Sequence, residues 1–172
     1  MTVWLKVENM DQVTPVRPHL LRDGEGEAVW FLGSLATMKA TGAQTGGRLT
    51  VIEFVNPPGF APPLHRHLVE DEAFYVLSGT VRFRCDGEQL EAGPGDFVLL
   101  PVGLPHTFIV GDAEPLRALQ ITTPSGFDNF VRQAGEPATE RRLPAPGPID
   151  PALLGHAAAQ YAIELLGPPP RP

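Results

Sequence analysis

The chain has 172 residues, of which 42% are hydrophobic, and its 20 acidic and 13 basic residues give a formal net charge of −7. This length favours a single domain. The acidic balance excludes the basic footprint of a nucleic-acid-binding protein and any charge attraction to anionic membranes. Proline (20 residues) and glycine (18) are frequent although hydrophobic runs recur throughout, which indicates a turn-rich β protein rather than a disordered chain.

The sequence shows no sign of secretion or of membrane targeting. Its first residues lack the basic start and apolar stretch of a signal peptide. No hydrophobic run is long enough to span a bilayer, and the single cysteine, Cys85, excludes an internal disulfide. We therefore expect a cytoplasmic protein without a membrane partner.

The chain divides into three parts. Residues 1–27 mix proline and glycine with no periodic pattern, so we expect an N-terminal arm that covers a barrel edge or reaches a partner subunit. Residues 28–124 alternate short hydrophobic runs with turn signals, which predicts about eight to ten short strands. The clearest predicted strands cover residues 28–39 (one or two strands), 48–55, 73–77, 81–85, 88–91, 107–110 and 116–122, with a flexible loop at 41–47.

Residues 125–172 change to a helical pattern. Hydrophobic residues from Phe127 to Ala134 recur at the spacing of one helical face, with Ser125 as the expected N-cap and Gly135 as the stop. A second helix is predicted to begin at Asp150, with Pro151 in its first turn, and to end near Tyr161. We expect a helical extension packed on the outside of the barrel.

Two histidines one residue apart are the strongest chemical signal. On a strand, His65 and His67 point to the same face and can reach one ion. In a helix, positions i and i+2 would point about 200° apart. Pro62 and Pro63 precede the pair and favour an extended entry. The spacing therefore predicts a strand that presents both imidazoles together.

Two further residues complete a candidate ligand set. Glu72 opens the hydrophobic run at 73–77, and His106 follows a proline-rich turn and leads the run at 107–110. Taken singly, Glu72 reads as part of a solvated acidic turn with Glu70 and Asp71, and a His-x-His pair can occur by chance. Three imidazoles and one carboxylate without a thiolate suit one divalent transition metal, namely Fe, Mn, Co, Ni, Zn or Cu.

These segments resemble the two motifs of the cupin superfamily. The residues that fill the motif positions are Gly59, His65, His67, Glu72 and Gly79 in the first block, and Gly95, Pro101, Gly103 and His106 in the second. The last position of the second motif holds Val110 in place of asparagine, which touches no ligand. The resemblance implies an all-β double-stranded β-helix, a jelly-roll or cupin barrel, with short C-terminal helices. It also implies that His65, His67, Glu72 and His106 bind the metal.

Strand parity suggests a substrate pocket. Phe74 and Val76 share the parity of Glu72, while Phe108 and Val110 share that of His106, so these side chains point inward if the ligands do. With the neighbouring Phe60 and Leu64 they form the predicted pocket. A barrel core made of the same residues is the open alternative.

Within the superfamily, the chain resembles small single-domain bacterial cupins similar to quercetin 2,3-dioxygenase. This resemblance implies a metal-dependent dioxygenase acting with O2 on an aromatic or enolizable small molecule, with Glu72 as both ligand and catalytic base. It also implies a homodimer. The main alternative is a non-catalytic metal-containing sensor or small-molecule-binding cupin. An isomerase or epimerase would need a further inward acid or base, for which Tyr75, His19 and Glu53 are poorly placed. Four intact ligand positions argue against a purely structural cupin.

Overall fold

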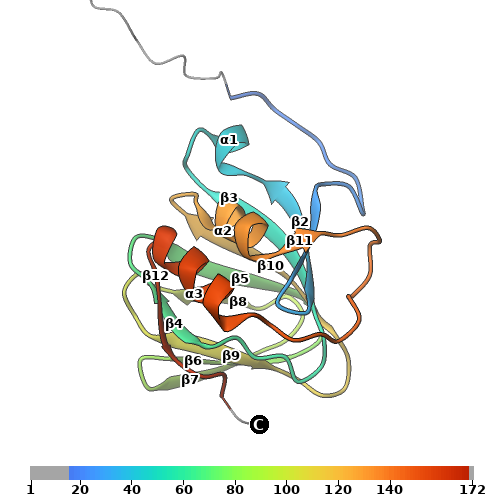
Figure 1. The fold of residues 1–172 in the computed structure, drawn as a ribbon. Helices are drawn as coiled ribbons and strands as arrows, with labels where there is room; N and C mark the ends of the chain where they lie inside the picture. The colour runs from blue at the N-terminus through green and yellow to red at the C-terminus, as the bar shows by residue number, and fades with distance from the viewer. Residues whose placement is uncertain (1–15, 171–172) are drawn as a thin grey trace, which may run out of the picture.

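A computed structural model describes residues 16–170, and within this range two antiparallel sheets face each other as a barrel (Figure 1). The first sheet has the order β11 (Glu136–Pro137), β1 (Ala28–Phe31), β2 (Ser34–Ala40), β3 (Thr50–Asn56), β10 (Leu116–Thr123), β5 (Asp71–Ser78) and β8 (Phe97–Leu100). The second has the order β12 (Ile163–Gly167), β4 (Leu64–His67), β9 (His106–Val110), β6 (Val81–Cys85) and β7 (Glu88–Ala92). The predicted all-β jelly-roll fold is confirmed.

Alternating side chains explain why these segments form sheets with one buried face. In β6, Val81, Phe83 and Cys85 are buried while Arg82 and Arg84 are exposed. Strand β3 shows the same period of two over seven residues. This alternation turns one face of each strand toward the barrel interior and leaves the other toward solvent.

Strand register brings the chemical residues to one end of the barrel. In the second sheet, His65 of β4 lies opposite His106 of β9. In the first sheet, Glu72 of β5 lies between Thr122 of β10 and Leu100 of β8. The three imidazoles thus come from one sheet and the carboxylate from the other.

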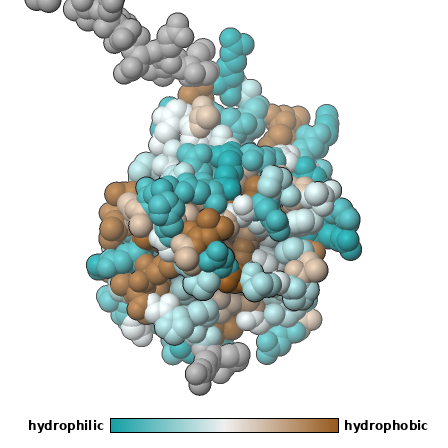
Figure 2. Space-filling model, viewed as in Figure 1, coloured by the Kyte–Doolittle hydropathy of each residue, from teal (hydrophilic) through white to brown (hydrophobic). Residues whose placement is uncertain are grey.

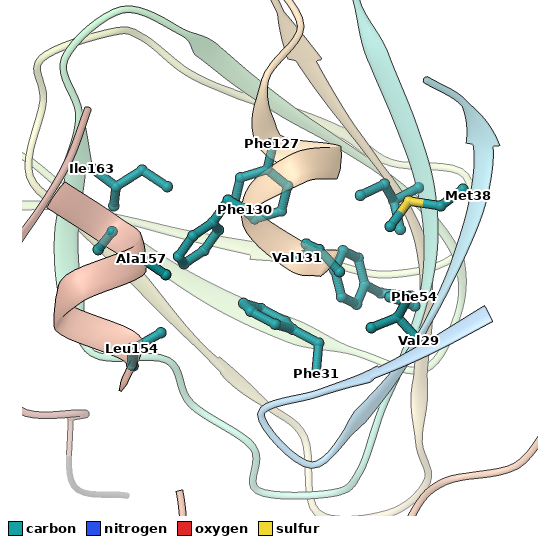
Figure 3. Packing of buried hydrophobic residues seen from close by; sticks show 13 residues of the cluster. Val29, Phe31, Met38, Phe54, Phe127, Phe130, Val131, Leu154, Ala157 and Ile163 are labelled. Carbon is teal, nitrogen blue, oxygen red and sulfur yellow. The ribbon is translucent and has the colours of Figure 1, made fainter. Parts of the chain in front are cut away.

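Helices α2 (Phe127–Ala134) and α3 (Pro151–Gln160) pack together beside β1, β3 and β12. Figure 3 shows Phe127 and Phe130 of α2 pointing toward Phe31 of β1 and into a hydrophobic cluster that both helices share with the sheets. We call this the upper cluster, and it comprises Val29, Phe31, Ala36, Met38, Ile52, Phe54, Phe127, Phe130, Val131, Leu154, Ala157, Ala158 and Ile163. The predicted capping of α3 by Asp150, with Pro151 in the first turn, is confirmed.

Two local predictions are wrong at polar turns. The loop at 41–47 contains a one-turn helix, α1 (Gly42–Thr45), because Thr41 and Gln44 form a reciprocal capping box. Ser125 does not cap α2, since the N-cap residue is Gly126 and makes no side-chain cap bond. The Phe127 N–H donates instead to the Glu70 carboxylate, 3.0 Å away, which takes over the capping role.

The sequence pattern predicted a helical C-terminal extension, but the structure shows that part of it forms a strand. After α3 the chain reverses at Ala162, whose φ is 54°, and residues 163–167 form β12. This strand pairs with β4, with Ile163 opposite His67 and Leu165 opposite His65. The extension therefore adds a strand to the ligand-bearing sheet as well as covering the barrel.

Residues 16–27 contain turns but no helix or strand, and the first fifteen residues of the expected N-terminal arm lie outside the described residues. The division at residues 27 and 124 stays a prediction. On the face shown in Figure 2, hydrophobic patches lie over the region of α3 and β12, where Leu153, Leu165 and Leu166 are exposed. Across residues 16–170, each helix is too short or too polar to cross a membrane.

Candidate metal centre

The four residues singled out by spacing meet in the barrel interior. His65, His67, Glu72 and His106 each offer one ligand atom, and these atoms all lie within 4.8 Å of one another. The side chains of His67, His106 and Glu72 are almost completely buried, whereas His65 is half-buried and borders a cavity. The geometry therefore provides three imidazole nitrogens and one carboxylate around a common point.

Each imidazole is held by its outer nitrogen. The Nδ1 atoms of His65 and His106 lie 2.8 Å from the carbonyl oxygens of Pro63 and Leu104, which can only accept a hydrogen bond. The Nδ1 atom of His67 lies 2.8 Å from Oε2 of Glu70. Nδ1 is therefore the donor in all three rings, which leaves each Nε2 with a free lone pair, the tautomer that a metal ligand needs.

Glu72 lies at the centre of the polar contacts. Its Oε2 is 3.1 Å from His106 Nε2, and its Oε1 is 3.7 Å from His67 Nε2. The side-chain amide of Gln120 donates a short hydrogen bond to Oε1. Burial alone would raise the pKa of Glu72, but the close His106 imidazole and the charges of His67 and His65 lower it to about 2. The residue is therefore a carboxylate at any physiological pH.

The pKa values of His65 and His106 are shifted in opposite directions. Burial, followed by the charge of His106, lowers the pKa of His65 to about 4. Burial also acts to lower the pKa of His106, but the neighbouring Glu72 carboxylate overcomes it and raises that pKa. Without an ion, a proton on His106 thus partly compensates the buried carboxylate.

Two buried nitrogens show what the cluster lacks. Among the described residues, His67 Nε2 and His106 Nε2 have no hydrogen-bond partner, because the approach of Glu72 is an ion-pair contact without hydrogen-bond geometry. Buried polar atoms are rarely left unpaired. A transition-metal ion would take both lone pairs together with those of His65 and Glu72, and three nitrogens with one oxygen suit such an ion. The residues present therefore fit a bound metal.

A cavity of about 60 Å³ opens beside His65 and Glu72. Its walls are mostly aromatic or aliphatic and come from both sheets and from α2, α3 and β12. The side chains that bound it include Phe31, Phe54, Phe60, Phe108, Phe127, Phe130, Leu154 and Ile163, with Asn56 and Gln120 as polar members. A site with this lining can hold a small apolar molecule against the ligand cluster.

Two of the six predicted pocket residues, Phe60 and Phe108, line this cavity. The other four, Leu64, Phe74, Val76 and Val110, do not line it. Strand alternation fixes which face of the sheet a side chain occupies but not its position along the barrel axis. Phe74 lies in the other hydrophobic cluster of the barrel, where its ring centroid is 5.0 Å from that of Phe83. Leu64 directly precedes His65 on β4, so its side chain points to the other face.

Sequence reasoning missed the residues that support the ligands. Glu70 lies beside Asp71 and Glu72 in an acidic run that reads as solvated, yet it is 2% exposed and holds His67. Gln120 carries no sequence signal apart from its inward parity on β10. The aromatic face of α2 was visible as a helical period, but the pattern did not show that Phe127 and Phe130 border the cavity.

Comparison with known proteins supports the cupin resemblance. The Cupin domain family matches residues 52–122 of the chain. Quercetin 2,3-dioxygenase of Bacillus subtilis is 37% identical over 91 residues, which cover 53% of this chain and 27% of that protein. The chain thus matches about a quarter of that relative's length. An uncharacterized protein of Methanocaldococcus jannaschii is 24% identical over 63% of this chain and 81% of its own length.

Solved structures agree on the fold. A predicted oxalate decarboxylase from Thermotoga maritima superimposes with a TM-score of 0.57 and 18% identity, over 62% of this chain and 99% of its own. KdgF from a Halomonas species gives a TM-score of 0.51 and 20% identity, over 64% of this chain and 91% of its own. At these identities the likeness concerns the barrel alone.

Proposed function

Since this chain is a cupin that resembles quercetin 2,3-dioxygenase, we propose that it is a metal-dependent dioxygenase acting on an aromatic or enolizable small molecule. The observation that carries the proposal is the contact between two unlike environments. A polar ligand cluster of His65, His67, Glu72 and His106 opens directly onto an apolar cavity. This arrangement suits a substrate with one acidic oxygen and a hydrocarbon body.

In this proposal His65, His67 and His106 hold the metal through Nε2, and Glu72 contributes an oxygen. The metal, when bound, supplies Lewis-acid and redox chemistry toward the substrate and O2. Glu72 is the catalytic base that accepts the proton of the substrate hydroxyl. Its low pKa keeps it ionised but makes it a weak base, so the proton transfer depends on the metal acidifying the bound substrate hydroxyl.

Gln120 gives Glu72 a defined orientation. Its amide donates to Oε1 of the carboxylate, so Oε2 remains on the side of His106 and the ligand cluster. Both residues border the cavity. A substrate hydroxyl that enters the cavity therefore meets a carboxylate whose rotation is restricted, which is the geometric requirement for efficient proton transfer.

The cavity favours a compact substrate. Its volume of about 60 Å³ lies far below the roughly 300–1,000 Å³ of pockets that hold drug-sized ligands. A three-ring flavonol would require Phe127, Phe130 or Leu154 to move. Apolar walls also exclude water from the reacting centre. We therefore place small enols and enolizable diketones ahead of flavonols as candidate substrates.

The test begins with elemental analysis of protein purified without chelators, beside His106→Ala. About one transition-metal ion per chain, lost in the variant, is expected from the ligand set. O2 consumption is then followed for protein reloaded with Fe, Mn, Co, Ni or Cu, using small enols, diketones and flavonols. Metal-loaded protein that consumes no O2 with any of these compounds would contradict the dioxygenase proposal.

A non-catalytic metal-containing sensor or carrier is the second candidate. It is favoured by one observation: among the described residues, Glu72 is the only carboxylate that borders the cavity, and His65 is the only other titratable side chain there. A small molecule that co-purifies unchanged with the metal-loaded protein, in the absence of any O2 uptake, would support this candidate.

A further inference from the structure

Glu70 is a buried carboxylate that does not belong to the ligand cluster. It is 2% exposed, and each of its oxygens has one strong partner. Oε2 accepts from His67 Nδ1 at 2.8 Å, and Oε1 accepts from the backbone N–H of Phe127 at 3.0 Å. Burying a carboxylate is costly unless its oxygens are paired. One side chain therefore links a ligand to the first turn of α2.

The start of α2 is shaped to receive this carboxylate. Gly126 has a φ of 156°, and a Cβ added there would lie 3.0 Å from Glu70 Oε1, so a side chain at this position would press on the carboxylate. The ring of Phe127 also packs against the ring of His67, with their centroids 5.5 Å apart. Residues 126–127 thus contact the His67–Glu70 pair through both backbone and side chain.

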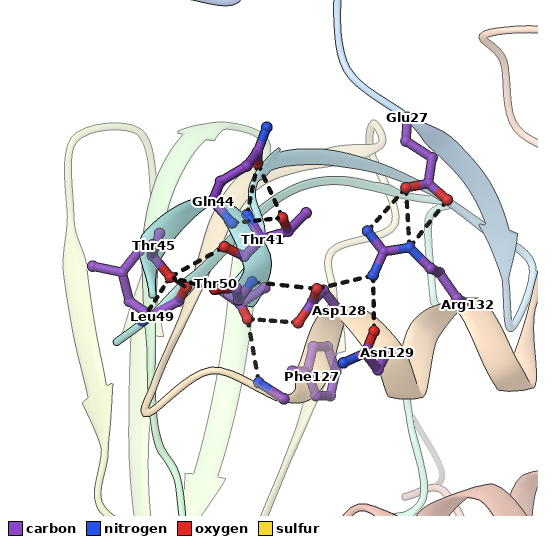
Figure 4. A network of polar contacts seen from close by, with 12 residues as sticks. Glu27, Thr41, Gln44, Thr45, Leu49, Thr50, Phe127, Asp128, Asn129 and Arg132 are labelled. Atoms are coloured by element: carbon purple, nitrogen blue, oxygen red, sulfur yellow. Dashed lines mark hydrogen bonds and ion pairs between the residues drawn. The ribbon is translucent and has the colours of Figure 1, made fainter. Parts of the chain in front are cut away.

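The same turn is fixed on its other side. Asp128 is buried and accepts hydrogen bonds from Thr50 of β3 at 3.1 Å and from Arg132 at 2.9 Å. Figure 4 shows Asp128 at the centre of this network, where it accepts from Thr50, from the backbone N–H of Gly42 in α1 and from Arg132, which also pairs with Glu27. This anchor on β3 makes the start of α2 a defined surface against which Glu70 is held, rather than a loose turn.

Helix α2 carries part of the cavity wall. Phe127 and Phe130 both border the cavity, and Phe130 also packs against Tyr161 at 6.2 Å, at the end of α3. A shift at the start of α2 would therefore change the room available beside His65 and Glu72. The Glu70 side chain connects the orientation of a ligand to the shape of the space that a substrate enters.

We propose that Glu70 is a positioning residue that couples metal binding at His67 to the docking of α2 against the barrel. This inference rests on the metal centre of the proposed function and adds a role that the ligand set does not contain. Glu70 holds the His67 proton on Nδ1 and keeps Nε2 free, while its second oxygen fixes Phe127. A cation on Nε2 polarises the Nδ1–H and strengthens its bond to the carboxylate. By linkage, the bound metal and the docked helix stabilise each other equally.

The test replaces Glu70 by glutamine and titrates Co²⁺ against a chelator. The amide oxygen of Glu70→Gln can still accept from Phe127, but the amide cannot also accept from His67 Nδ1–H without turning its NH2 toward the helix. We expect Co²⁺ affinity to fall by roughly 10–100-fold, the range typical of lost partners behind metal-ligating histidines. The visible absorption spectrum of bound Co²⁺ should also change, because the His67 ring is no longer held.

Hydrogen–deuterium exchange gives a second readout that does not depend on any activity. In the wild-type protein, Co²⁺ is expected to slow amide exchange across residues 127–131. In Glu70→Gln this metal-dependent slowing is expected to disappear even at saturating Co²⁺. The wild-type comparison needs no variant, so exchange at residues 127–131 that does not respond to Co²⁺ would contradict the coupling even if the substitution prevents folding.

A matched control is available on the adjoining strand. Glu164 of β12 pairs with Arg66 at 2.6 Å on the exposed face, next to the ligand strand but away from the ligands. Glu164→Gln makes the same chemical change, and its Co²⁺ affinity is expected to stay within about twofold of wild type.

The outcomes separate the two proposals. Unchanged affinity in Glu70→Gln, or exchange at residues 127–131 that ignores Co²⁺ in the wild type, would overturn the coupling while leaving the metal centre in place. Wild-type protein that binds no Co²⁺ would overturn the metal centre and the coupling together. Wild-type protein that shows the coupling but consumes no O2 with any candidate substrate would overturn only the dioxygenase activity.

Discussion

The two hydrophobic clusters inside the barrel have similar composition but different construction. The lower cluster is built by strands β5 to β10 and comprises Phe74, Val76, Val81, Phe83, Cys85, Ala92, Val98, Leu100, Phe108, Val110, Leu116 and Ala118. Phe83 is completely buried in it between Phe74 and Phe108, and of these residues Phe108 alone also borders the cavity. The upper cluster draws on β1, β2, β3, α2, α3 and β12, and its aromatic side chains surround the cavity beside the ligands. The barrel motif thus supplies a closed base and the ligands, while segments outside the motif decide what space is left above them.

This difference predicts unequal responses to the same substitution. In the lower cluster, Phe83→Ala removes a ring that packs on all sides, so we expect the free energy of unfolding to fall by about 3–5 kcal/mol. Chemical denaturation of the metal-free protein, followed by circular dichroism, measures the loss. Folded variant protein should still bind one metal ion per chain. A loss below about 1 kcal/mol would show that this half of the barrel is less tightly packed than its burial suggests.

In the upper cluster, Phe130→Ala is expected to be less costly, at about 2–3 kcal/mol, because a ring that borders open space gives up fewer contacts. The same change enlarges the cavity. Bulkier enols should therefore gain in kcat/KM relative to compact ones, as measured by O2 uptake across a size series. Phe130→Leu is the control, with an intermediate effect on both quantities. A destabilisation equal to that of Phe83→Ala, with no change in substrate size preference, would remove the distinction between the clusters.

The smallest expected effect is the pH dependence of Co²⁺ affinity, which is set by the protonation of His106 and His65. Below the raised pKa of His106, the metal-free protein holds a proton on Nε2 that a metal must displace. Affinity for Co²⁺ should therefore drop about tenfold per pH unit, or about 1.4 kcal/mol, as the pH falls below that value, and level off above it. His65, whose pKa is about 4, adds a second loss only near that pH. Chelator competition between pH 5 and 8.5 measures the slope, and a Co²⁺ affinity that stays constant across this range would contradict the prediction.

Much of the ligand set could be predicted from local rules, because spacing along a strand fixes the side-chain direction. His65 and His67 share a face for the same reason that Arg66 points outward to Glu164. What alternation does not encode is depth. Phe74 and Val76 point inward as predicted, yet their distance along the barrel axis places them in the filled base.

Contacts between distant segments were beyond local rules. The role of Glu70 depends on the Phe127 N–H, which is 57 residues away in the chain. Strand β12 is short and follows a helix directly, so its sequence resembles the frayed end of that helix until its partner β4 is known. The Ser125 cap failed for a similar reason, since a carboxylate from another segment took its place.

The pairing of β12 with β4 also sets an order of events during biosynthesis. All four candidate ligands have been translated once residue 106 is made, yet β4 gains its outer neighbour only when residues 163–167 follow. Until then the strand that carries His65 and His67 is an exposed edge, bonded on one side to β9 alone. A nascent chain on the ribosome can therefore display the ligands without the sheet that aligns them. We therefore expect metal acquisition only after residues 163–167 have left the ribosome and β12 has paired with β4.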